Sequence, residues 1–361
     1  METFDFEDGN GPVPAHRHPN GGGWVADSAT VEDTAFVGEN ARVYGNARVT
    51  DNARIADKAC VCETAKISEG GKVYGSAKVF GDAAVLGQAR VYGQALIYGF
   101  AKLDGSAQVY DSAHIHGSAM LRDSAWAYGF ARVFGEAQIA GEAVIEGNAR
   151  VSGFARIFGQ AKITDNAQVT GSSEVCQRAE ISGYARVDCA VVSGFARVTD
   201  HAVLKHGASV YGNAKILDTA LVRDNAKVFG DAIIKESAKV GGECRVFDSA
   251  EVFGRAEIHG TVQVFEFSRV YDDATLYDSV KVFGNSQVYN QATVWNSVSI
   301  SDHSKVFGRA TLCGDATIAD TAKVYGSAKV FGNAKVAGDV EVFGTMQIGN
   351  MEPQSPILDM M

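Results

Sequence analysis

The sequence predicts an all-β fold, a triangular solenoid built from short parallel strands. An aliphatic residue returns at every sixth position from Val25 to Val187 and again from Val192 to Ile348, and only Ala127 interrupts the aliphatic series. A small residue, nearly always alanine, lies two positions before each aliphatic one. Outward-facing aromatic residues recur every eighteen positions. Regular self-similarity over this length excludes an ordinary globular domain.

The period of six indicates one short strand and one corner per repeat. It fits neither the helical period of 3.6 nor the plain alternation of a long strand. Two inward residues at positions i and i+2 of a strand, followed by a turn, account for it. Corner pairs such as Gly45-Asn46 and Asp51-Asn52 supply residues that accept positive φ. Because strands this short can bury their inner face only against neighbouring repeats, we expect them to stack as a solenoid.

The period of eighteen predicts three strands per coil. Residues that stack on one face must recur once per full turn, and eighteen residues make three hexapeptides. Three aromatic series keep this spacing. They are Tyr74, Tyr92, Tyr110 and Tyr128; Tyr211, Phe229, Phe247, Phe265 and Phe283; and Phe253, Tyr271, Tyr289, Phe307, Tyr325 and Phe343.

The repeat resembles that of the hexapeptide-repeat superfamily over about nine-tenths of the chain. Members of that superfamily form single-stranded left-handed parallel β-helices, and many are acyltransferases, so the resemblance implies left-handed coils. In the usual pattern a glycine or acidic residue is adjacent to the aliphatic one, whereas here it falls one place later, as in Val43-Tyr44-Gly45-Asn46-Ala47. That variation, like the segment Gly21-Gly22-Gly23-Trp24, resembles the YdcK-type branch of bacteria and their phages.

The chain is expected to form one domain with two caps. Residues 25–348 are predicted to make about eighteen coils, spaced by ~4.8 Å, with residues 1–24 and 349–361 as terminal cap segments. Trp24 is expected to plug the open end of the first coil. The tail, with Ile357, Leu358, Met360 and Met361 after two prolines, is expected to fold back over the last coil. The interval from Val187 to Val192 is one residue short, which predicts a tightened corner and no domain boundary.

Composition narrows the classes of partner. The net charge of −10, with lysines and arginines interspersed among acids, argues against a nucleic-acid groove. No segment is apolar enough to span a membrane, and the acidic start lacks a secretory signal, so we expect a cytoplasmic protein or one carried in a virion. Six scattered cysteines indicate no disulfide framework and favour a reducing compartment.

An acyltransferase is the alternative function that the resemblance implies. Acyltransferases of the superfamily use a histidine on a coil or projecting loop and bind acyl-CoA or acyl carrier protein between subunits. The register here never gains residues between Val25 and Ile348, so no projecting loop is predicted. The histidines at outward or corner positions are most simply surface residues, and we predict no catalytic residue and no cofactor. These histidines are His114, His116, His201, His206, His259 and His303.

Two histidine pairs are candidate metal ligands. His201 and His206 resemble the two-histidine segment of γ-class carbonic anhydrases, which hold zinc with histidines of adjoining subunits. The pair is displaced by about one position, and catalytic zinc needs a third ligand that the sequence does not supply. His16 and His18 could gather at the axis of a trimer, but a pair alone is a weak signal. The sequence therefore predicts no metal site.

The aromatic series are the most specific candidate for a binding or association face. The predicted site residues are Tyr74, Tyr92, Tyr110, Tyr128, Phe253, Tyr271, Tyr289, Phe307, Tyr325 and Phe343. Stacked rings stabilise neighbouring parallel strands, and contiguous exposed rings also mark interfaces with another copy or with carbohydrate. The working hypothesis is a rigid non-catalytic scaffold that forms homo-oligomers or self-associates through these rings.

Overall fold

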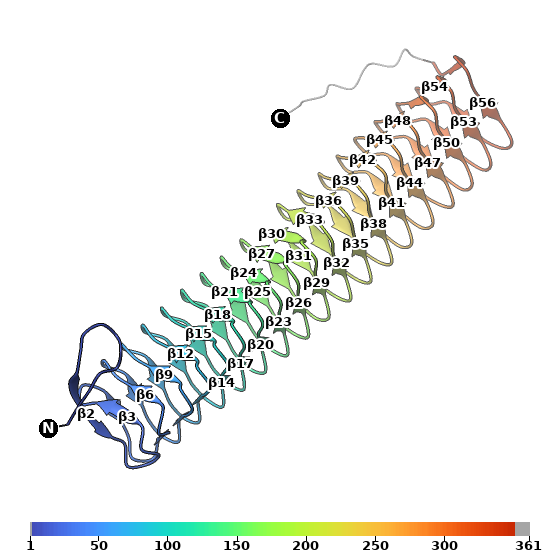
Figure 1. Ribbon diagram of the computed structural model, residues 1–361. Helices are drawn as coiled ribbons and strands as arrows, with labels where there is room; N and C mark the ends of the chain where they lie inside the picture. Colours follow the sequence, from blue (N-terminus) through green and yellow to red (C-terminus); the bar gives the residue numbers. More distant parts are fainter. Residues whose placement is uncertain (1, 351–361) are drawn as a thin grey trace. The chain divides into compact units, whose positions relative to one another are not determined.

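The computed structural model describes residues 2–350, and every regular element in this range is a β-strand (Figure 1). These residues fall into two compact units, with the boundary between Gly183 and Tyr184. The predictions about the tail residues Ile357, Leu358, Met360 and Met361 lie outside the described residues. Between residues 2 and 350 no helix is long and apolar enough to cross a membrane.

Unit 1 is a coil of two- and three-residue strands with three faces. The first face contains β3 (Trp24–Ala26), β6 (Arg42–Val43), β9 (Cys60–Val61), β12 (Lys78–Val79), β15 (Leu96–Ile97), β18 (His114–Ile115), β21 (Arg132–Val133), β24 (Arg150–Val151) and β27 (Gln168–Thr170). The second contains β4 (Thr30–Val31), β7 (Arg48–Val49), β10 (Lys66–Ile67), β13 (Ala84–Val85), β16 (Lys102–Leu103), β19 (Met120–Leu121), β22 (Gln138–Ile139), β25 (Arg156–Ile157) and β28 (Glu174–Val175). The third contains β5 (Phe36–Val37), β8 (Arg54–Ile55), β11 (Lys72–Val73), β14 (Arg90–Val91), β17 (Gln108–Val109), β20 (Trp126–Ala127), β23 (Val144–Ile145), β26 (Lys162–Ile163) and β29 (Glu180–Ile181).

Unit 2 repeats the same plan. Its first face contains β30 (Arg186–Asp188), β33 (Val203–Lys205), β36 (Leu221–Val222), β39 (Lys239–Val240), β42 (Glu257–Ile258), β45 (Thr275–Leu276), β48 (Thr293–Val294), β51 (Thr311–Leu312), β54 (Lys329–Val330) and β57 (Gln347–Ile348). The second contains β31 (Val191–Val192), β34 (Ser209–Val210), β37 (Lys227–Val228), β40 (Arg245–Val246), β43 (Gln263–Val264), β46 (Lys281–Val282), β49 (Ser299–Ile300), β52 (Thr317–Ile318) and β55 (Lys335–Val336). The third contains β32 (Arg197–Val198), β35 (Lys215–Ile216), β38 (Ile233–Ile234), β41 (Glu251–Val252), β44 (Arg269–Val270), β47 (Gln287–Val288), β50 (Lys305–Val306), β53 (Lys323–Val324) and β56 (Glu341–Val342).

Strands pair in parallel with partners eighteen residues away, which confirms the predicted triangular coil. Lys66 is opposite Ala84 in unit 1, and Lys215 is opposite Ile233 in unit 2. Away from the first and last coils, the aliphatic and small positions of the repeat point inward and are almost fully buried, Ala127 included. The core of each unit is therefore a stack of alanines and β-branched or leucine side chains, one slice per coil.

Corners combine positive φ with a side-chain hydrogen bond. The first residue of most corner pairs has positive φ, whether it is glycine, as Gly45 at 68°, or an acid, as Asp218 at 56°. The acidic side chain accepts the backbone N–H of the residue one coil later: Asp123 accepts from Gly141 at 3.0 Å, and Asp218 from Glu236 at 2.9 Å. The corner acids thus replace glycine while satisfying an otherwise free amide.

The predicted tightened corner lies in unit 2. There β30 pairs with β33 through partners seventeen residues apart, Arg186 with Val203, instead of eighteen. Cys189 lies in the shortened turn and has a positive φ of 51°. The parallel register resumes on the next strand, where Val191 is opposite Ser209.

The N-terminal segment covers strand edges, but the prediction for Trp24 is wrong. Two antiparallel strands, β1 (Thr3–Phe4) and β2 (Val13–Arg17), lie against β3, and the following loop bonds to β5 through Gly23 N and Val37 O at 2.9 Å. Trp24 lies opposite Arg42 at an outward position and stacks on Phe4 at 4.4 Å, while Val25 points inward. The core of the first coil is narrow enough for valine to fill it, so the larger ring packs outside.

Candidate binding surface on the third face of unit 2

Six aromatic residues of unit 2 stack into one continuous ladder on the third face. Each follows a third-face strand directly, beginning with Phe253 after β41 and ending with Phe343 after β56. Neighbouring ring centroids are 4.8–4.9 Å apart and the ring planes are nearly parallel, except for the last pair, Tyr325 and Phe343, at 5.7 Å. The structure therefore brings together all the predicted site residues of unit 2. We call this set the third-face ladder of unit 2.

The stacking decides which part of each ring is exposed. Because the faces of successive rings cover one another, the outward surface of the ladder consists of ring edges and tyrosine hydroxyls. Tyr271 donates to Gln287 at 3.3 Å and Tyr325 to Glu341 at 3.0 Å. The face of Phe253 at the start of the ladder is covered by Lys235, whose Nζ is 4.9 Å from the ring centroid. Burial raises the pKa of Tyr271 and Tyr289, so these phenols stay neutral.

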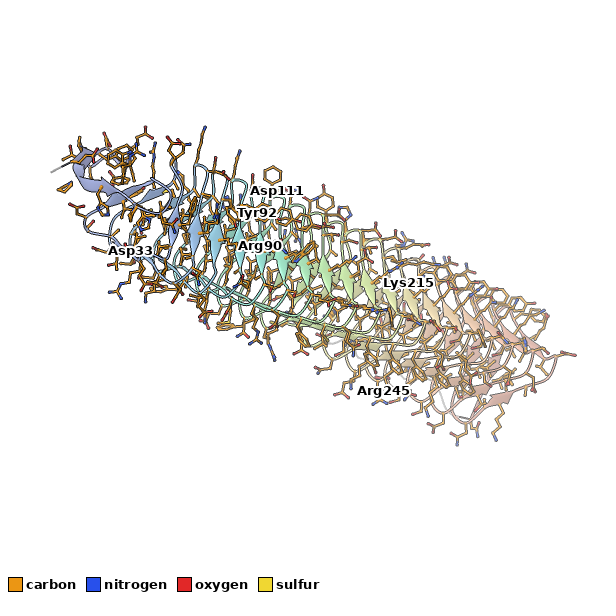
Figure 2. The ribbon with its side chains drawn as sticks, turned by 90° about the horizontal axis from the view of Figure 1, so that it is seen from below. Asp33, Arg90, Tyr92, Asp111, Lys215 and Arg245 are labelled. Carbon is orange, nitrogen blue, oxygen red and sulfur yellow. The ribbon has the colours of Figure 1, made fainter. Side chains whose placement is uncertain are left out.

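The predicted series in unit 1 is only partly brought together. Tyr92, Tyr110 and Tyr128 stack at 4.8 and 4.7 Å on the third face. Between residues 2 and 350 no ring contact joins Tyr74 to Tyr92. A shallow groove of about 500 Å³ lies there, lined by Asp57, Tyr74, Gly75, Arg90, Tyr92, Gly93 and Gln108. Figure 2 labels Arg90 and Tyr92 among the side chains that project from these coils.

Two further ladders were missed because the sequence reasoning did not follow every face at the eighteen-residue spacing. Phe80, Tyr98, His116 and Phe134 stack on the first face of unit 1 at 4.8–5.1 Å. On the first face of unit 2, Trp295, Cys313 and Phe331 are buried together with Tyr277 packed against them. Counting histidine as an aromatic would have revealed the first set. The series from Tyr211 to Phe283 stacks as predicted, at 4.9–5.0 Å on the second face of unit 2.

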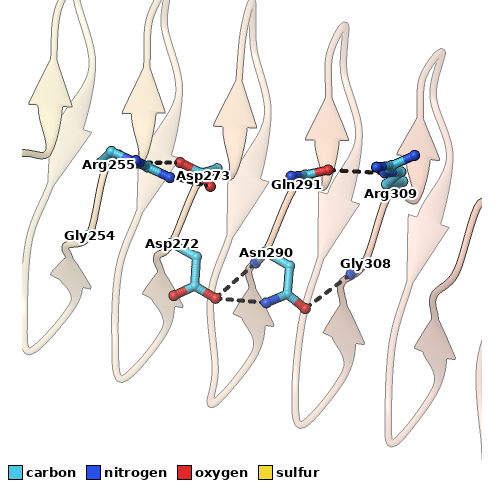
Figure 3. A pocket seen from close by; sticks show the side chains of 8 residues that line it. All are labelled: Gly254, Arg255, Asp272, Asp273, Asn290, Gln291, Gly308 and Arg309. Atoms are coloured by element: carbon cyan, nitrogen blue, oxygen red, sulfur yellow. Dashed lines mark hydrogen bonds and ion pairs between the residues drawn. The ribbon is translucent and has the colours of Figure 1, made fainter.

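The corner beside the third-face ladder of unit 2 forms a shallow polar groove of about 640 Å³ (Figure 3). It is lined by Gly254, Arg255, Asp272, Asp273, Asn290, Gln291, Gly308 and Arg309. Arg255 donates two hydrogen bonds to Asp273, at 2.6 and 2.8 Å, and Arg309 donates to Gln291 at 3.0 Å. The bond from Arg255 lowers the pKa of Asp273 and raises that of Arg255.

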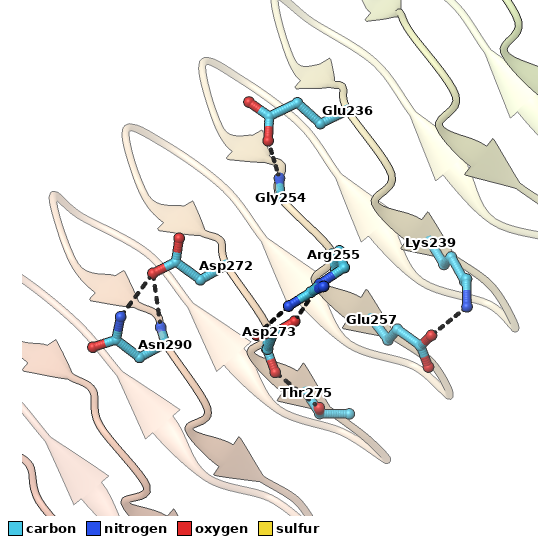
Figure 4. A network of polar contacts seen from close by, with 9 residues as sticks. All are labelled: Glu236, Lys239, Gly254, Arg255, Glu257, Asp272, Asp273, Thr275 and Asn290. Carbon is cyan, nitrogen blue, oxygen red and sulfur yellow. Dashed lines mark hydrogen bonds and ion pairs between the residues drawn. The ribbon is translucent and has the colours of Figure 1, made fainter.

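The groove has a floor of backbone held by the corner hydrogen bonds (Figure 4). Gly254 has φ of 72°, and a Cβ there would lie 2.6 Å from Asp272 N, so only glycine fits. Its N–H donates to Glu236 at 2.9 Å, and Asp272 accepts both the backbone and side-chain N–H groups of Asn290 at 3.2 and 2.9 Å. The polar row is therefore fixed on a rigid support.

A second charged row flanks the ladder on the other side. It consists of the outward strand residues Glu251, Arg269, Gln287, Lys305, Lys323 and Glu341. Glu251 contacts Lys235 at 3.0 Å and Arg269 at 3.6 Å, and Lys323 contacts Glu341 at 2.8 Å. The candidate surface is thus an apolar strip between two rows of mixed charge.

His201 and His206 lie at opposite ends of β33. His201 lies at the corner before β33 and stacks on Tyr184 at 5.0 Å, whereas His206 follows β33 with φ of 54°. His16 contacts Asp27 at 2.8 Å, and His18 is buried with its Nδ1 3.2 Å from Asn20 O. Over residues 2–350, no three histidine, cysteine or acidic side chains gather as a metal site.

Comparison with known proteins finds a similarity to the repeat. A family model described as the YdcK beta solenoid repeat matches residues 41–57, which is one coil from β6 to β8. A search of curated proteins found no match. Among solved structures, LpxA from Acinetobacter baumannii is 13% identical, with 50% of this chain and 70% of that chain covered and a TM-score of 0.21. The pattern of the matched coil recurs in coil after coil of both units, so the repeat of this chain is similar to the YdcK beta solenoid repeat.

Proposed function

We propose that this protein is a structural scaffold that associates with a second copy of itself through the third face of unit 2. One observation carries the proposal: the third-face ladder of unit 2 is continuous over six coils, and its rings remain partly exposed. Contiguous apolar surface of this extent is typical of interaction sites. Single exposed rings, in contrast, need no explanation.

The exposed ring edges favour a flat protein partner over a sugar. A sugar ring packs against the face of an aromatic side chain, and here the faces are covered by neighbouring rings or, at Phe253, by Lys235; among the described residues Phe343, the last ring, has a neighbouring ring on one side alone. A second ladder can instead lie edge to edge along the first, with the flanking charged rows meeting on either side. We therefore assign the strip to self-association and not to carbohydrate.

The order of charges favours a parallel arrangement of the two copies. In a parallel pair with ladder on ladder, the strand row of one copy faces the corner row of the other at the same level. Glu251 then faces Arg255 of the second copy and Arg269 faces Asp273, which outnumber the one like-charged pair, Lys305 with Arg309. An antiparallel pair would bring Glu251 against Glu341 and Arg269 against Lys323. Like charges across an interface cost affinity and suppress that geometry.

The size of the strip sets the expected strength. Six coils at ~4.8 Å give a length of about 29 Å, and a strip one face wide buries on the order of 1,000 Å² in total. That value is at the lower limit for specific interfaces, so we expect a dissociation constant in the micromolar range.

Light scattering after size-exclusion chromatography, over a wide range of protein concentration, tests the proposal. We expect a monomer–dimer equilibrium that the pair Tyr289→Ser and Phe307→Ser weakens by at least about tenfold, since these are the central rings of the strip. The matched control is Phe247→Ser with Phe265→Ser, which removes two rings stacked at the same 4.9 Å on the second face. Equal loss in both pairs, or a parent protein that stays monomeric, would contradict the assignment.

Charge exchange tests the orientation in the same assay. Arg269→Asp and Asp273→Arg should each weaken the dimer, whereas the double variant should recover most of the affinity because the facing pair is restored with opposite sign. A double variant weaker than either single one would rule out the parallel arrangement while leaving self-association intact.

A further inference from the structure

The groove on the third face of unit 1 lies where the aromatic ladder of that unit is interrupted. It has a volume of about 500 Å³ and is lined by both Tyr74 and Tyr92. Tyr92 stacks on Tyr110 at 4.8 Å, but among the described residues no ring and no cation is stacked on the face of Tyr92 that is turned toward Tyr74. The groove therefore offers an open aromatic face, which the inner rings of the third-face ladder of unit 2 do not.

Two corner glycines keep the floor of the groove free of side chains. Gly75 and Gly93 line it with φ of 63° and 71°. A Cβ at Gly75 would lie 2.9 Å from the carbonyl oxygen of Gly93, and a Cβ at Gly93 would lie 2.8 Å from Asp111 N, so larger residues do not fit. Gly75 N donates to Asp57 at 3.0 Å. The floor is thus fixed backbone.

A row of three cations runs along the strand side of the groove. Lys72 on β11 is opposite Arg54 on β8 and opposite Arg90 on β14, so like charges face each other on successive coils, which costs stability. The guanidinium of Arg54 covers the ring of Phe36 at 3.8 Å. Within the part of the chain that the structure describes, the side chains of Lys72 and Arg90 make no hydrogen bond and no ion pair. These two cations are available to an anion.

Hydrogen-bonding groups of both kinds complete the lining. Asp57 lies in the corner after β8, across the tyrosine row from Arg90. Gln108 follows Arg90 in the strand row and accepts from the hydroxyl of Tyr92 at 3.5 Å. Burial raises the pKa of Tyr74 and of Tyr92, so both hydroxyls keep their protons. A cation and an acid therefore flank one open ring face.

We propose that this groove binds an acidic saccharide, a chain of sugar rings that carry carboxylates. The apolar face of one sugar ring packs on the open face of Tyr92. Its carboxylate accepts from Arg90, the carboxylate of the next sugar accepts from Lys72, and ring hydroxyls donate to Asp57. A chain suits the site because the cations recur once per coil, at ~4.8 Å. The bound carboxylates also remove the repulsion between the stacked cations.

The shallow groove favours a saccharide over a nucleotide, the other common anion with a ring. A planar base on the single open ring face of Tyr92 would keep its second face in water, whereas enclosed pockets cover most of a ligand. A sugar ring has one apolar face and polar edges, which suit an open site. Because the groove buries little of the ligand, we expect a dissociation constant on the order of 1 mM for a trisaccharide.

Isothermal titration calorimetry of the full chain with trigalacturonate at low salt tests the proposal. We expect saturable binding that weakens as the ionic strength is raised, because the cations are exposed. Maltotriose, a neutral trisaccharide, and citrate, which carries carboxylates but no ring, should each bind about tenfold more weakly. Equal binding of maltotriose or citrate, tighter binding of uridine monophosphate, or no binding of trigalacturonate would overturn the assignment.

Variants place the ligand in the groove. Arg90→Gln and Tyr92→Ser should each weaken trigalacturonate binding about tenfold, whereas Tyr92→Phe keeps the ring face and should keep most of the affinity. The matched controls are Arg48→Gln, which removes an exposed arginine opposite Lys66 on the second face, and Tyr98→Ser, which removes a stacked ring of the first face. Equal losses in the controls, or full binding in both Arg90→Gln and Tyr92→Ser, would contradict the proposed site.

Discussion

His116 is the residue at which this fold should respond to mild acid. It stacks between Tyr98 at 4.8 Å and Phe134 at 5.1 Å, and burial, followed by the nearby His114 and Arg132, lowers its pKa below the ordinary value of 6.5. The unfolded chain therefore takes up the proton first as the pH falls. The neutral ring contributes fully to the free energy of unfolding above about pH 6.5. This contribution is lost as the pH falls through the lowered pKa of His116 in the folded protein.

We expect His116→Phe to reduce the fall in melting temperature between pH 7.5 and pH 5 by on the order of 1 °C. The change is small because the ring is half-exposed and solvent screens its charge. The measurement is thermal unfolding by circular dichroism at both pH values. Tyr98→Phe is the control, since it preserves the ladder and removes no imidazole. An unchanged pH dependence in His116→Phe would show that the ring does not couple protonation to folding.

At the corners, the sequence predicts the backbone conformation but not the hydrogen bonds. Glycine, asparagine and aspartate at regular spacing predict positive φ, and the structure has it at Gly45 and Asp51. The sequence does not reveal that the acids also accept an amide N–H one coil later, because that partner depends on how closely successive coils stack.

Variants of Asp218 can separate the two roles of a corner acid, which are to adopt positive φ and to accept a hydrogen bond from the next coil. Its φ is 56°, and it accepts from Glu236 N at 2.9 Å. Asp218→Asn keeps an acceptor and tolerates this φ, so stability should hardly change. Asp218→Gly loses only the hydrogen bond, at about 1 kcal/mol, whereas Asp218→Ala also takes on left-handed strain of about 1–2 kcal/mol. Urea unfolding followed by circular dichroism should give midpoints in the order Asn, Gly, Ala; an alanine variant as stable as asparagine would contradict this account.

At the scale of the whole molecule, periodicity predicted what each coil repeats and failed where repetition ends. Alanine and aliphatic positions predicted the core of both units, because every slice has the same inner space to fill. Trp24 was misplaced because the first coil has no preceding neighbour, so the packing of the leading segment depends on contacts that occur once. Phe6, Ala15 and Ala26 form such a cluster, with Phe4, Val13, Trp24 and Tyr44 packed against it.

That cluster leads to a prediction about the exposed strand edge of unit 1. Deleting residues 2–17 removes β1 and β2 and leaves the hydrogen-bonding edge of β3 open, and an open edge pairs with other chains. In the Tyr289→Ser, Phe307→Ser background, where association through the third face of unit 2 is removed, the deletion should produce concentration-dependent oligomers in light scattering. Glu7→Gln is the control, because it breaks the 2.8 Å contact with Arg42 but keeps both strands. Oligomers should be absent in that control, and a deletion variant that stays monomeric with protected amides in β3 would show that the edge needs no cover.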